Sequence, residues 1–549
     1  MAINSAAPLK FPISEDKSIS SSPQLQSPTM SSEADDCNSN TERLHFLLVP
    51  LMAQGHMIPM IDLARLLVGR GALVTFVTTP VNLARIQPIV DRAVAAALPI
   101  RFIELPFPAK DVGLPDGCEN CDLIPSMDLY LTFLRALSLL REPLEAYLRI
   151  PDPSRWPKPA CIISDNIQYW TVDVARALGI PRLIFHGPSC FYLLCYLLID
   201  RNRAELEAEM EAASGKPILL PGLPQPIQIR KHEVIPIWRF MPDWFEFIEV
   251  LQMAGESAGG VLINSFNELE PWYFEKYHEM TGKAIWPVGP LSLYKEEFDA
   301  KVTRGRASSI DHELLFQWLD KQEDGSVVFI SFGSIARNTK AQLVELGHGL
   351  EASGRPFVWV VKEASEGSVL GLDEWIAEFE ERVEGRGIVI RGWAPQTVIL
   401  EHIAVGGFVT HCGWNSTLEA VAAGVVMATW PHFADQFLNE QLVVNVLKIG
   451  VAVGVEEPTT VGLENNKEEV VKVRREQVEK VLETLMAGGE EGEERRVRVR
   501  ELREKARMAM EEGGSSWEGL KDVINYVKQA KKEKEKDKSK KPAVLEGVC

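Results

Sequence analysis

The chain lacks a long hydrophobic run. No uninterrupted apolar stretch reaches the roughly 18 residues that a membrane-spanning helix needs. The first 40 residues are rich in serine, proline, asparagine and aspartate, and they lack the basic start and apolar core of a secretory signal. We therefore expect residues 1–43 to be a disordered leader on a cytoplasmic protein. A plastid address is the alternative, against which the acidic residues between positions 15 and 36 count.

Positive charge is also in short supply. The chain carries 58 lysines and arginines against 77 aspartates and glutamates, a formal net charge of −19. This excess of acid argues against nucleic acid or an anionic membrane as the main partner. A small anionic ligand remains compatible with it, because backbone N–H groups at the start of a helix can bind an anion locally.

Metal and redox motifs are nearly absent. The eight cysteines are scattered, and only Cys118 and Cys121 form a Cys-x-x-Cys pair, without a second pair or a histidine at metal-ligand spacing. A zinc or redox site at this pair is the less favoured alternative to a loop with free thiols. The pattern suits a reducing compartment.

Two common catalytic motifs are missing in the setting that they need. Gly-x-Ser-x-Gly occurs once, at 255–259, but it precedes a short apolar run rather than following a strand, as a nucleophile elbow requires, and this argues against a serine hydrolase. No Gly-x-Gly-x-x-Gly follows the first predicted strand, which counts against a nicotinamide-dependent oxidoreductase.

What the sequence does contain is an alternation of strand and helix patterns. A continuous apolar run at 44–50 predicts a buried parallel strand, and a glycine-containing turn at 53–56 follows it. Helical spacing at 58–71 and a second buried strand at 72–79 complete a βαβ unit. Further elements of this half are expected as strands at 100–105, 161–164 and 182–185 and a helical stretch at 126–148.

A second α/β series follows, and 549 residues are too many for a single core. Its expected elements are strands at 326–331, 357–361, 387–390, 407–410 and 425–429, a helix at 342–352, and charged surface helices at 477–485 and 494–510. The predicted organisation is a first α/β domain at 44–291, a polar linker at 292–312, a second α/β domain at 313–515, a helix at 516–530 that packs back on the first domain, and a charged disordered tail at 531–549.

Two polar residues stand at the ends of predicted strands in the first half. His56 follows the first strand at the mouth of a helix, and Asp165 ends the strand pattern at 161–165. Ligands of open α/β sheets bind at this carboxyl edge. A histidine there suits a general base, and a carboxylate that holds one of its ring nitrogens would orient it. The alternative for His56 is a helix-capping or loop residue. We favour a base and its orienter acting on a bound hydroxyl.

The second half holds candidate phosphate-binding groups. The turn at 331–334 follows a strand and could offer amides and a hydroxyl to phosphate, although many such turns contain glycine and serine. His411 and the helix start at 413–416 fit the same role, because the helix dipole favours a diphosphate.

Candidate base-binding and sugar-binding groups surround that helix start. Trp393 suits stacking on an aromatic base, or else is a core tryptophan. Glu419, expected on the first turn of the helix, could bond both hydroxyls of a ribose, or is an ordinary acid at a helix start. Asp435 and Gln436 could bond sugar hydroxyls, or simply begin the next helix.

The 44 positions from Trp393 to Gln436 resemble the signature box of plant UDP-dependent glycosyltransferases of family 1. Those enzymes have the GT-B fold, in which two doubly wound Rossmann-like α/β domains face each other across a cleft. The resemblance extends from about 44 to 530 through GHMIPMIDLA, TTPVN, CIISD, FHGPSCF and VVFISFGS. GLPDGCEN and PSMDL resemble the branch that acts on sapogenins, flavonols, brassinosteroids and cytokinins.

The resemblance implies a role for each candidate. It makes His56 the base and Asp165 its charge-orienting partner. It implies uracil and ribose contacts from Trp393, Ala394, Gln396 and Glu419, phosphate contacts from Ser334, His411, Asn415 and Ser416, and sugar contacts from Trp414, Asp435 and Gln436. Glutamine at position 436 is usual in glucose users of the family, whereas histidine there is associated with galactose.

The sequence therefore predicts an inverting transfer of glucose from UDP-glucose to a hydroxyl of a small apolar plant metabolite, a triterpenoid, steroid or flavonoid, by a monomer that requires no metal or other cofactor. Another UDP-sugar (galactose, xylose or glucuronic acid) is the alternative donor. An oxidoreductase and a non-catalytic nucleotide-sugar binding protein are the competing classes. The acceptor pocket is expected around Met57, 118–130, 186–192 and 238–244. Val426 departs from the proline common in the family, and a small change in loop stiffness is expected there.

Overall fold

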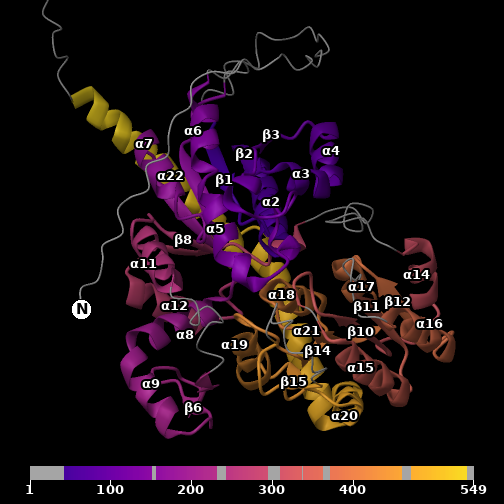
Figure 1. Cartoon of the computed structure of the whole chain (residues 1–549). Coiled ribbons are helices and arrows are strands. Elements are labelled where there is room, and N and C mark those ends of the chain that lie inside the picture. Colours follow the sequence, from indigo (N-terminus) through magenta and orange to yellow (C-terminus); the bar gives the residue numbers. More distant parts are fainter. Residues whose placement is uncertain are drawn as a thin grey trace, which may run out of the picture.

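The computed structural model describes residues 43–150, 156–231, 243–294, 310–336, 338–362, 371–459 and 471–540. Nearly all of the expected leader and the last nine residues of the expected tail lie outside these ranges. Two parallel sheets, each covered by helices, form two α/β units that lie against each other (Figure 1). Among the described residues, no helix combines the length and the apolar character that crossing a membrane requires.

The first unit is built on a seven-stranded sheet of order β3-β2-β1-β4-β5-β8-β9. Its strands are β1 (His45–Val49), β2 (Leu73–Thr78), β3 (Ile100–Glu104), β4 (Cys161–Asp165), β5 (Arg182–His186), β8 (Val261–Ile263) and β9 (Ile285–Pro287). Its helices are α2 (Gln54–Gly69), α3 (Pro80–Arg85), α4 (Gln87–Ala95), α5 (Tyr130–Ser138), α6 (Arg141–Arg149), α7 (Thr171–Leu178), α8 (Cys190–Arg201), α9 (Arg203–Ala212), α11 (Asp243–Glu256) and α12 (Pro271–Thr281). A small antiparallel pair, β6 (Ile218–Leu219) with β7 (Gln228–Ile229), lies outside the main sheet.

The second unit is built on a six-stranded sheet of order β12-β11-β10-β13-β14-β15. Its strands are β10 (Val327–Ser331), β11 (Phe357–Val361), β12 (Gly387–Arg391), β13 (Val405–Thr410), β14 (Val426–Thr429) and β15 (Gly450–Ala452). The later helices are α14 (His312–Leu319), α15 (Lys340–Ser353), α16 (Leu372–Arg382), α17 (Gln396–Glu401), α18 (Trp414–Ala423), α19 (Gln436–Gln441), a π-helical turn (Leu442–Val446), α20 (Arg475–Met486), α21 (Glu490–Met510) and α22 (Ser515–Lys540).

Each sheet reverses its strand order at one place. In the first sheet the reversal lies between β1 and β4, which pair in parallel, and in the second it lies between β10 and β13. Helices that follow such neighbouring strands leave on opposite faces, so a crevice opens at the carboxyl ends of the two strands. The topology therefore provides one ligand-binding edge in each domain.

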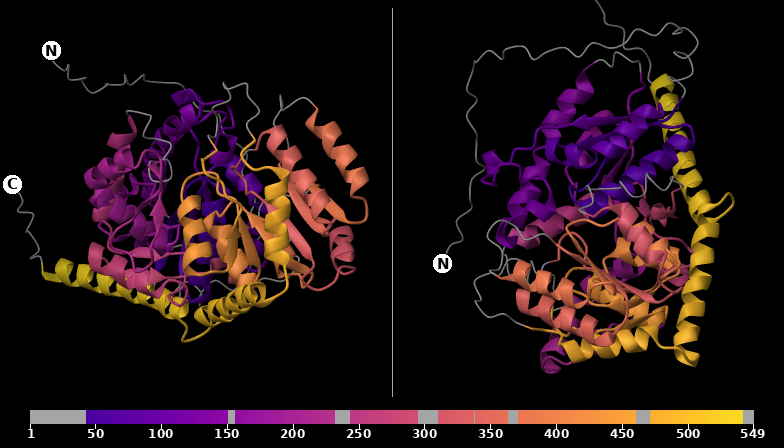
Figure 2. Two further views of the ribbon diagram at one scale, coloured as in Figure 1. Left: turned by 90° about the horizontal axis from the view of Figure 1, so that it is seen from below. Right: turned by 90° about the vertical axis from the view of Figure 1, so that its right-hand side faces the viewer.

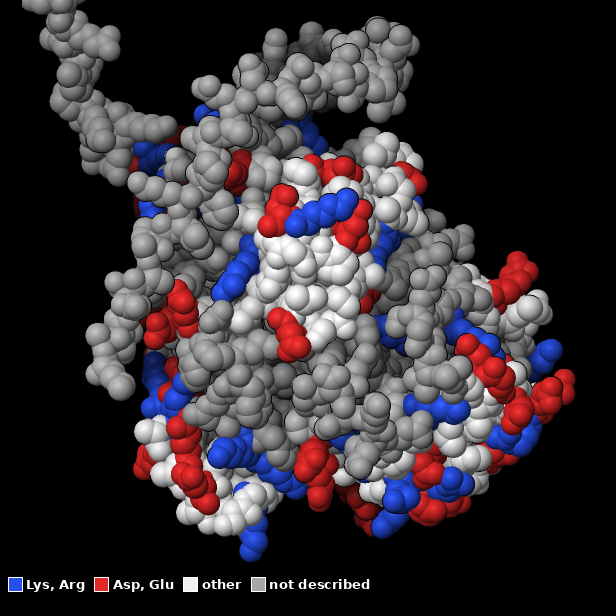
Figure 3. Space-filling model, viewed as in Figure 1, with Lys and Arg blue, Asp and Glu red and all other residues white. Residues whose placement is uncertain are grey.

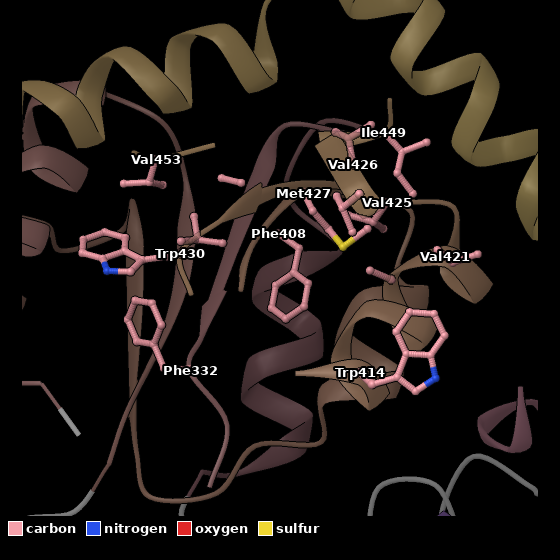
Figure 4. Close-up of a cluster of buried hydrophobic side chains, with 14 of the residues drawn as sticks. Phe332, Phe408, Trp414, Val421, Val425, Val426, Met427, Trp430, Ile449 and Val453 are labelled. Atoms are coloured by element: carbon pink, nitrogen blue, oxygen red, sulfur yellow. The ribbon is translucent and has the colours of Figure 1, made fainter. Parts of the chain in front are cut away.

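Buried apolar side chains of the strands and helices of the second unit form the core of the second domain (Figure 4). Phe329 of β10 stacks on Phe408 of β13 with ring centroids 5.1 Å apart. Trp414, at the start of α18, is 4% exposed and belongs to the same apolar cluster. The strand expected at 425–429 corresponds to β14, and Val426 is its first residue, pairs with Gly407 and is buried. The change in loop stiffness expected from Val426 is therefore wrong, because the residue lies in the strand.

The last helix, α22, lies against the first domain, whereas α21 lies against the second (Figure 2). Leu520, Val523, Ile524 and Val527 of α22 are buried in the core of the first domain. The helix continues to Lys540, so the disorder expected from 531 is wrong for residues 531–540. Lysine and glutamate are good helix formers, and pairs such as Gln529 with Glu533 add support four residues apart.

Candidate active site

The base and its partner meet at the reversal of the first sheet. His56 lies in the first turn of α2, after β1, and Asp165 is the last residue of β4. His56 Nδ1 lies 2.6 Å from Asp165 Oδ2, and the other carboxylate oxygen accepts a hydrogen bond from the Ile167 N–H at 3.1 Å. The Asp165 side chain is 3% exposed and that of His56 is 32% exposed. When Nδ1 donates to the carboxylate, Nε2 is the nitrogen that can accept a proton.

The electrostatic setting of His56 favours its protonated form. Burial is the largest single influence and lowers its pKa, but the charge and hydrogen bond of Asp165 raise it more, so the pKa lies above the ordinary histidine value. Asp435 of the second domain raises it further. Gly187 packs on the imidazole, since a Cβ there would lie 3.3 Å from His56 Cε1. The base thus lies between its own sheet and a carboxylate from the other domain.

In the second domain, two glycines enclose His411 at the reversal of the sheet. A Cβ on Gly333, which has φ +72°, would lie 2.7 Å from His411 Nε2. A Cβ on Gly413 would lie 2.4 Å from the same nitrogen. Both positions therefore require glycine. Burial, with a smaller effect of the nearby His432, lowers the pKa of His411 to about 3. The imidazole is therefore neutral near pH 7 and can donate a hydrogen bond but carries no charge.

The backbone on either side of His411 turns sharply toward α18. Cys412 has φ +62°, which is uncommon for a residue other than glycine. No side chain caps the start of α18 at Gly413, so its first N–H groups have no such partner. Ser334 follows β10, the neighbouring strand, and its carbonyl oxygen accepts from Lys362 Nζ at 2.7 Å. Groups of this kind at the start of a helix could bind an anion.

A glutamine on α17 joins two of the predicted nucleotide contacts. Gln396 Nε2 donates to Ser416 Oγ at 2.9 Å and to Glu419 Oε2 at 2.7 Å. Glu419 is not on the first turn of α18, as the sequence suggested, because the helix begins at Trp414 and places it on the second turn. Ser416 and Glu419 are three residues apart and so lie on the same face toward α17.

The residues predicted to bind the uracil precede α17. Trp393 and Ala394 follow β12, the outermost strand of the second sheet, and Ala394 is 7% exposed. Trp393 is partly exposed, which distinguishes it from fully buried core residues such as Trp359.

Asp435 and Gln436 begin α19, which was the alternative interpretation of this pair, and they also lie at the carboxyl edge of the sheet after β14. Asp435 Oδ2 accepts from Asn439 Nδ2 at 2.8 Å. Burial raises the Asp435 pKa. Gln436 Oε1 accepts from the N–H groups of His432 and Phe433 at 2.8 and 3.1 Å. These bonds orient the glutamine amide so that its nitrogen is the end available to a ligand.

Several contacts join the two edges. Asn415 Nδ2 donates to Gly55 O, beside His56, and Asn415 Oδ1 accepts from Asn264 Nδ2 at 3.2 Å. Trp414 Nε1 donates to the Asn264 carbonyl at 2.7 Å. Sequence reasoning missed Asn264, although its place directly after the apolar run 261–263 is the same signal that identified Asp165.

Ser189 and Asn439 also meet across the cleft, with Ser189 Oγ donating to Asn439 Oδ1 at 3.3 Å. The Asn439 amide therefore contacts both the first domain and Asp435. It was missed as well, because a helical asparagine four residues after Asp435 carries no strand-end signal.

The region expected to line an acceptor pocket is only partly described. Cys118 and Cys121 are buried free thiols, and Cys118 Sγ lies 3.5 Å from the Leu123 carbonyl oxygen. Within the described ranges, no three histidine, cysteine, aspartate or glutamate side chains are grouped to hold a metal ion.

Burial lowers the pKa of His186, another residue of the expected lining, to about 4. Residues 238–242 of the expected lining lie outside the described residues.

Comparisons with known proteins agree with this arrangement. A family model described as UDP-glucoronosyl and UDP-glucosyl transferase matches residues 290–483, and one described as a glycosyltransferase N-terminal domain matches residues 42–293. UDP-glycosyltransferase 73E1 of Stevia rebaudiana is 44% identical over 490 residues, which cover 88% of this chain and 96% of the relative.

Two solved structures show the same arrangement of domains. The crystal structure of Glycyrrhiza uralensis UGT73P12 complexed with glycyrrhetinic acid 3-O-monoglucuronide is similar with a TM-score of 0.80 and 38% identity, over 90% of this chain and 98% of that one. The structure of Arabidopsis thaliana UGT89C1 complexed with UDP-L-rhamnose is similar with a TM-score of 0.68 and 30% identity, over 89% of this chain and all of that one.

Proposed function

Because the chain belongs to the plant UDP-glycosyltransferase family, we propose that it is an inverting O-glucosyltransferase that uses UDP-glucose. The acceptor is a hydroxyl group of a small apolar plant metabolite, a triterpenoid, steroid or flavonoid. The observation that carries the proposal is the His56–Asp165 pair, 2.6 Å apart, which lies across the cleft from Asp435 and the start of α18. Base, orienting group and donor-binding groups all come from one chain, which supports action as a monomer.

The transfer begins with proton removal. His56 Nε2 accepts the proton of the acceptor hydroxyl, and Asp165 stabilises the imidazolium through Nδ1. The acceptor oxygen forms a bond to the anomeric carbon of the sugar on the face opposite the diphosphate. The bond from that carbon to the phosphate oxygen breaks, and UDP leaves with the electron pair. Attack from the opposite face inverts the anomeric configuration.

The leaving diphosphate gains negative charge as this bond breaks. The uncapped N–H groups at the start of α18, together with the positive end of the helix dipole, stabilise that charge. His411 is neutral and contributes a hydrogen bond. Ser334, Asn415 and Ser416 add polar side chains at the same edge.

The nucleoside would lie along the outer strands of the second sheet. Trp393 stacks on uracil, beside Ala394, and Gln396 with Glu419 contacts the ribose. The hydrogen bond between Gln396 and Glu419 supports this role, because it holds the carboxylate toward α17.

Glucose is the proposed donor sugar because of Gln436. Its Oε1 is held by two backbone N–H groups, which directs the amide nitrogen as a donor toward a sugar hydroxyl. Asp435 accepts from another hydroxyl, and Trp414 borders the sugar. The UDP-L-rhamnose complex of a neighbouring structure makes other UDP-sugars the competing possibility, so the test must compare donors.

An apolar, polycyclic acceptor is supported by a relative and by the first domain. UGT73P12 was solved in complex with glycyrrhetinic acid 3-O-monoglucuronide. In this chain, Met57, next to the base in sequence, and Phe191 are buried, and burial, with Asp435 as a smaller influence, raises the pKa of Tyr192.

The test is release of UDP from UDP-glucose in the presence of a panel of triterpenoids, steroids and flavonoids, with products identified by mass spectrometry. UDP-galactose, UDP-xylose and UDP-glucuronic acid serve as competing donors. We expect glucosides, and we expect His56→Ala to lower turnover about 10²- to 10⁴-fold while UDP still binds. Unchanged turnover of His56→Ala would rule out the proposed base, and preference for another donor would rule out glucose.

A further inference from the structure

We propose that Asn264 is a positioning residue for the transfer, which holds the start of α18 at a fixed place relative to the base. The inference rests on the proposed function. Asn264 belongs to the first domain, yet it bonds two consecutive residues of the donor helix, Trp414 and Asn415. The first domain thereby shapes the site at which the second domain holds the diphosphate.

The first step of the argument concerns the Gly55 carbonyl, one residue before the base. In an α-helix this oxygen would accept from the N–H of residue 59, but residue 59 is proline and has no N–H. The Gly55 carbonyl is therefore left without its helical partner. Asn415 Nδ2 donates to it instead. Pro59 thus makes room for a bond between the helix of the base and the helix of the donor site.

The second step concerns the other end of the Asn415 amide. Its Oδ1 accepts from Asn264 Nδ2 at 3.2 Å, so both ends of the amide contact the first domain. An amide nitrogen has two hydrogens, and one is used on Gly55. The second hydrogen of Asn415 Nδ2 remains for a phosphate oxygen. Its direction is set by the bonds of the amide to Gly55 and Asn264.

The third step is that Asn264 is itself rigidly placed. It follows β8, its N–H donates to the His186 carbonyl at 3.3 Å, and it is 3% exposed. Its Oδ1 accepts from the Leu291 N–H at 3.0 Å. A Cβ on Gly289 would lie 2.4 Å from that oxygen, so no larger residue fits there. Asn264 therefore acts as a fixed point of the first domain.

The consequence is geometric. Removing the Asn264 side chain frees the Asn415 amide to rotate and loosens the start of α18 relative to His56. Small misplacements of reacting groups cost large factors in rate. The KM for the donor is expected to change more than the KM for the acceptor, because Asn264 acts through Asn415 at the proposed diphosphate site.

The experiment compares Asn264→Ala and Asn264→Asp with Asn267→Ala in the full chain. Asn267 is an exposed asparagine in the same loop and is the matched control. Asn264→Asp keeps an acceptor for Leu291 but places an oxygen against Asn415 Oδ1. We expect both Asn264 variants to raise the KM for UDP-glucose about tenfold, the effect of one hydrogen bond at a charged ligand. The KM for the acceptor is expected to change less than twofold, as is every parameter of Asn267→Ala.

A double-mutant cycle distinguishes positioning from general damage to the fold. If Asn264 acts through Asn415, the combined Asn264→Ala and Asn415→Ala variant loses much less kcat/KM than the product of the single losses. Independent losses, or a donor KM unchanged in Asn264→Asp with a wild-type melting temperature, would overturn the inference. UDP binding by the wild-type chain is measured separately, so failure of the proposed function would show as wild-type protein that neither binds UDP nor turns over.

Pro59→Ala provides a second, independent variant. It returns an N–H to the Gly55 carbonyl and removes no side chain from the donor site. We expect melting at an equal or higher temperature, because proline disfavours a helix interior, with a donor KM raised about two- to threefold through competition for Gly55. A donor KM equal to that of the wild type would contradict the role assigned to the Gly55 carbonyl.

Discussion

At the scale of single residues, the active site depends on pairs that the chain brings together from distant positions. His56 and Asp165 are 109 residues apart and meet because β1 and β4 are neighbours at the reversal of the sheet. Their positions at strand ends could be predicted from the sequence, because apolar runs mark the strands. The Asn264 and Asn439 contacts could not, because they depend on how the two domains face each other.

The pH dependence of turnover follows from the His56 pair. A base must be neutral to accept a proton, so kcat/KM falls as the pH drops through the His56 pKa, which lies above the ordinary value of about 6.5. Asp165→Asn removes the group that raises this pKa. We expect the acidic limb to move to lower pH and the rate at pH 7.5 to fall about 10²-fold or more, because the imidazole loses its orienting partner. A pH-rate profile checks both.

The control for this prediction is Asp173→Asn. Asp173 is a half-exposed carboxylate on α7 that pairs with Arg141 and Arg176 on the surface. Its profile is expected to match that of the wild type. An acidic limb that stays in place in Asp165→Asn would show that another group controls it.

At the scale of elements, the start of α8 is held by two side chains, Ser189 and Glu270. Ser189 Oγ accepts from the Tyr192 N–H at 3.0 Å, and the buried Glu270 accepts from the N–H groups of Cys190 and Phe191 at 3.4 and 2.6 Å. Ser265 Oγ also donates to Glu270, at 2.5 Å. Because Ser189 contacts Asn439, these bonds connect the placement of α8 to α19, whose start is the proposed sugar site.

Glu270 is expected to make stability depend on pH. Burial raises its pKa to about 7, although the three hydrogen bonds oppose the shift. Between its unfolded pKa of about 4.3 and its folded value, the folded state binds more protons, so stability falls as the pH rises through this window. We expect the melting temperature of the wild type to fall more steeply from pH 5 to 7.5 than that of Glu270→Gln. Calorimetry at several pH values measures the difference.

The exposed Glu275, on α12 directly after Glu270, provides the matched control. The melting temperature of Glu275→Gln is expected to depend on pH as that of the wild type does. An equal pH dependence of the melting temperature in the wild type and Glu270→Gln would contradict the assigned pKa shift.

The strands of both sheets were easier to predict than the helices. A buried parallel strand is a short apolar run, and such runs at 44–50, 326–331 and 357–361 correspond closely to β1, β10 and β11. The helical stretch expected at 126–148 is instead a short 3₁₀ turn (Met127–Leu129) followed by α5 and α6, with a break at 139–140. Leucines on both sides of that break keep the helical period, so the sequence pattern alone does not show where the chain bends.

At the scale of the whole molecule, acidic and basic side chains are mixed on the described part of the face that Figure 3 shows. On α21, pairs such as Arg498 with Glu494 at 2.6 Å neutralise each other locally. A net charge of −19 is therefore compatible with the proposed diphosphate site, whose proposed contacts are backbone amides and neutral side chains.

The first domain is expected to need α22 for its stability. The four buried apolar side chains of this helix each contribute about 1.5–3 kcal/mol, a sum comparable with the whole stability of a typical domain. Arg70 also lies 3.8 Å from the Trp517 ring and donates to its carbonyl at 2.9 Å. A chain ending at Gly514 is therefore expected to be insoluble or to lose its cooperative thermal transition.

A chain ending at Ala530 is the control, because it keeps all four side chains and removes only the charged end of the helix. It is expected to melt within a few degrees of the full chain. A stable, active chain ending at Gly514 would show that α22 is dispensable.

The return of the chain through α22 has a mechanical consequence. The polypeptide returns from the second domain to the first between Met510, the end of α21, and Ser515, the start of α22. Ser516 Oγ donates to the Gly289 carbonyl, so this return is fastened to the first domain beside Gly289. A Cβ on Gly289 would lie 2.4 Å from Asn264 Oδ1, so the returning chain and Asn264 meet at one place. Because Trp414 of the second domain donates to the Asn264 carbonyl there, we expect the two domains to separate least at this place when the cleft opens to exchange UDP.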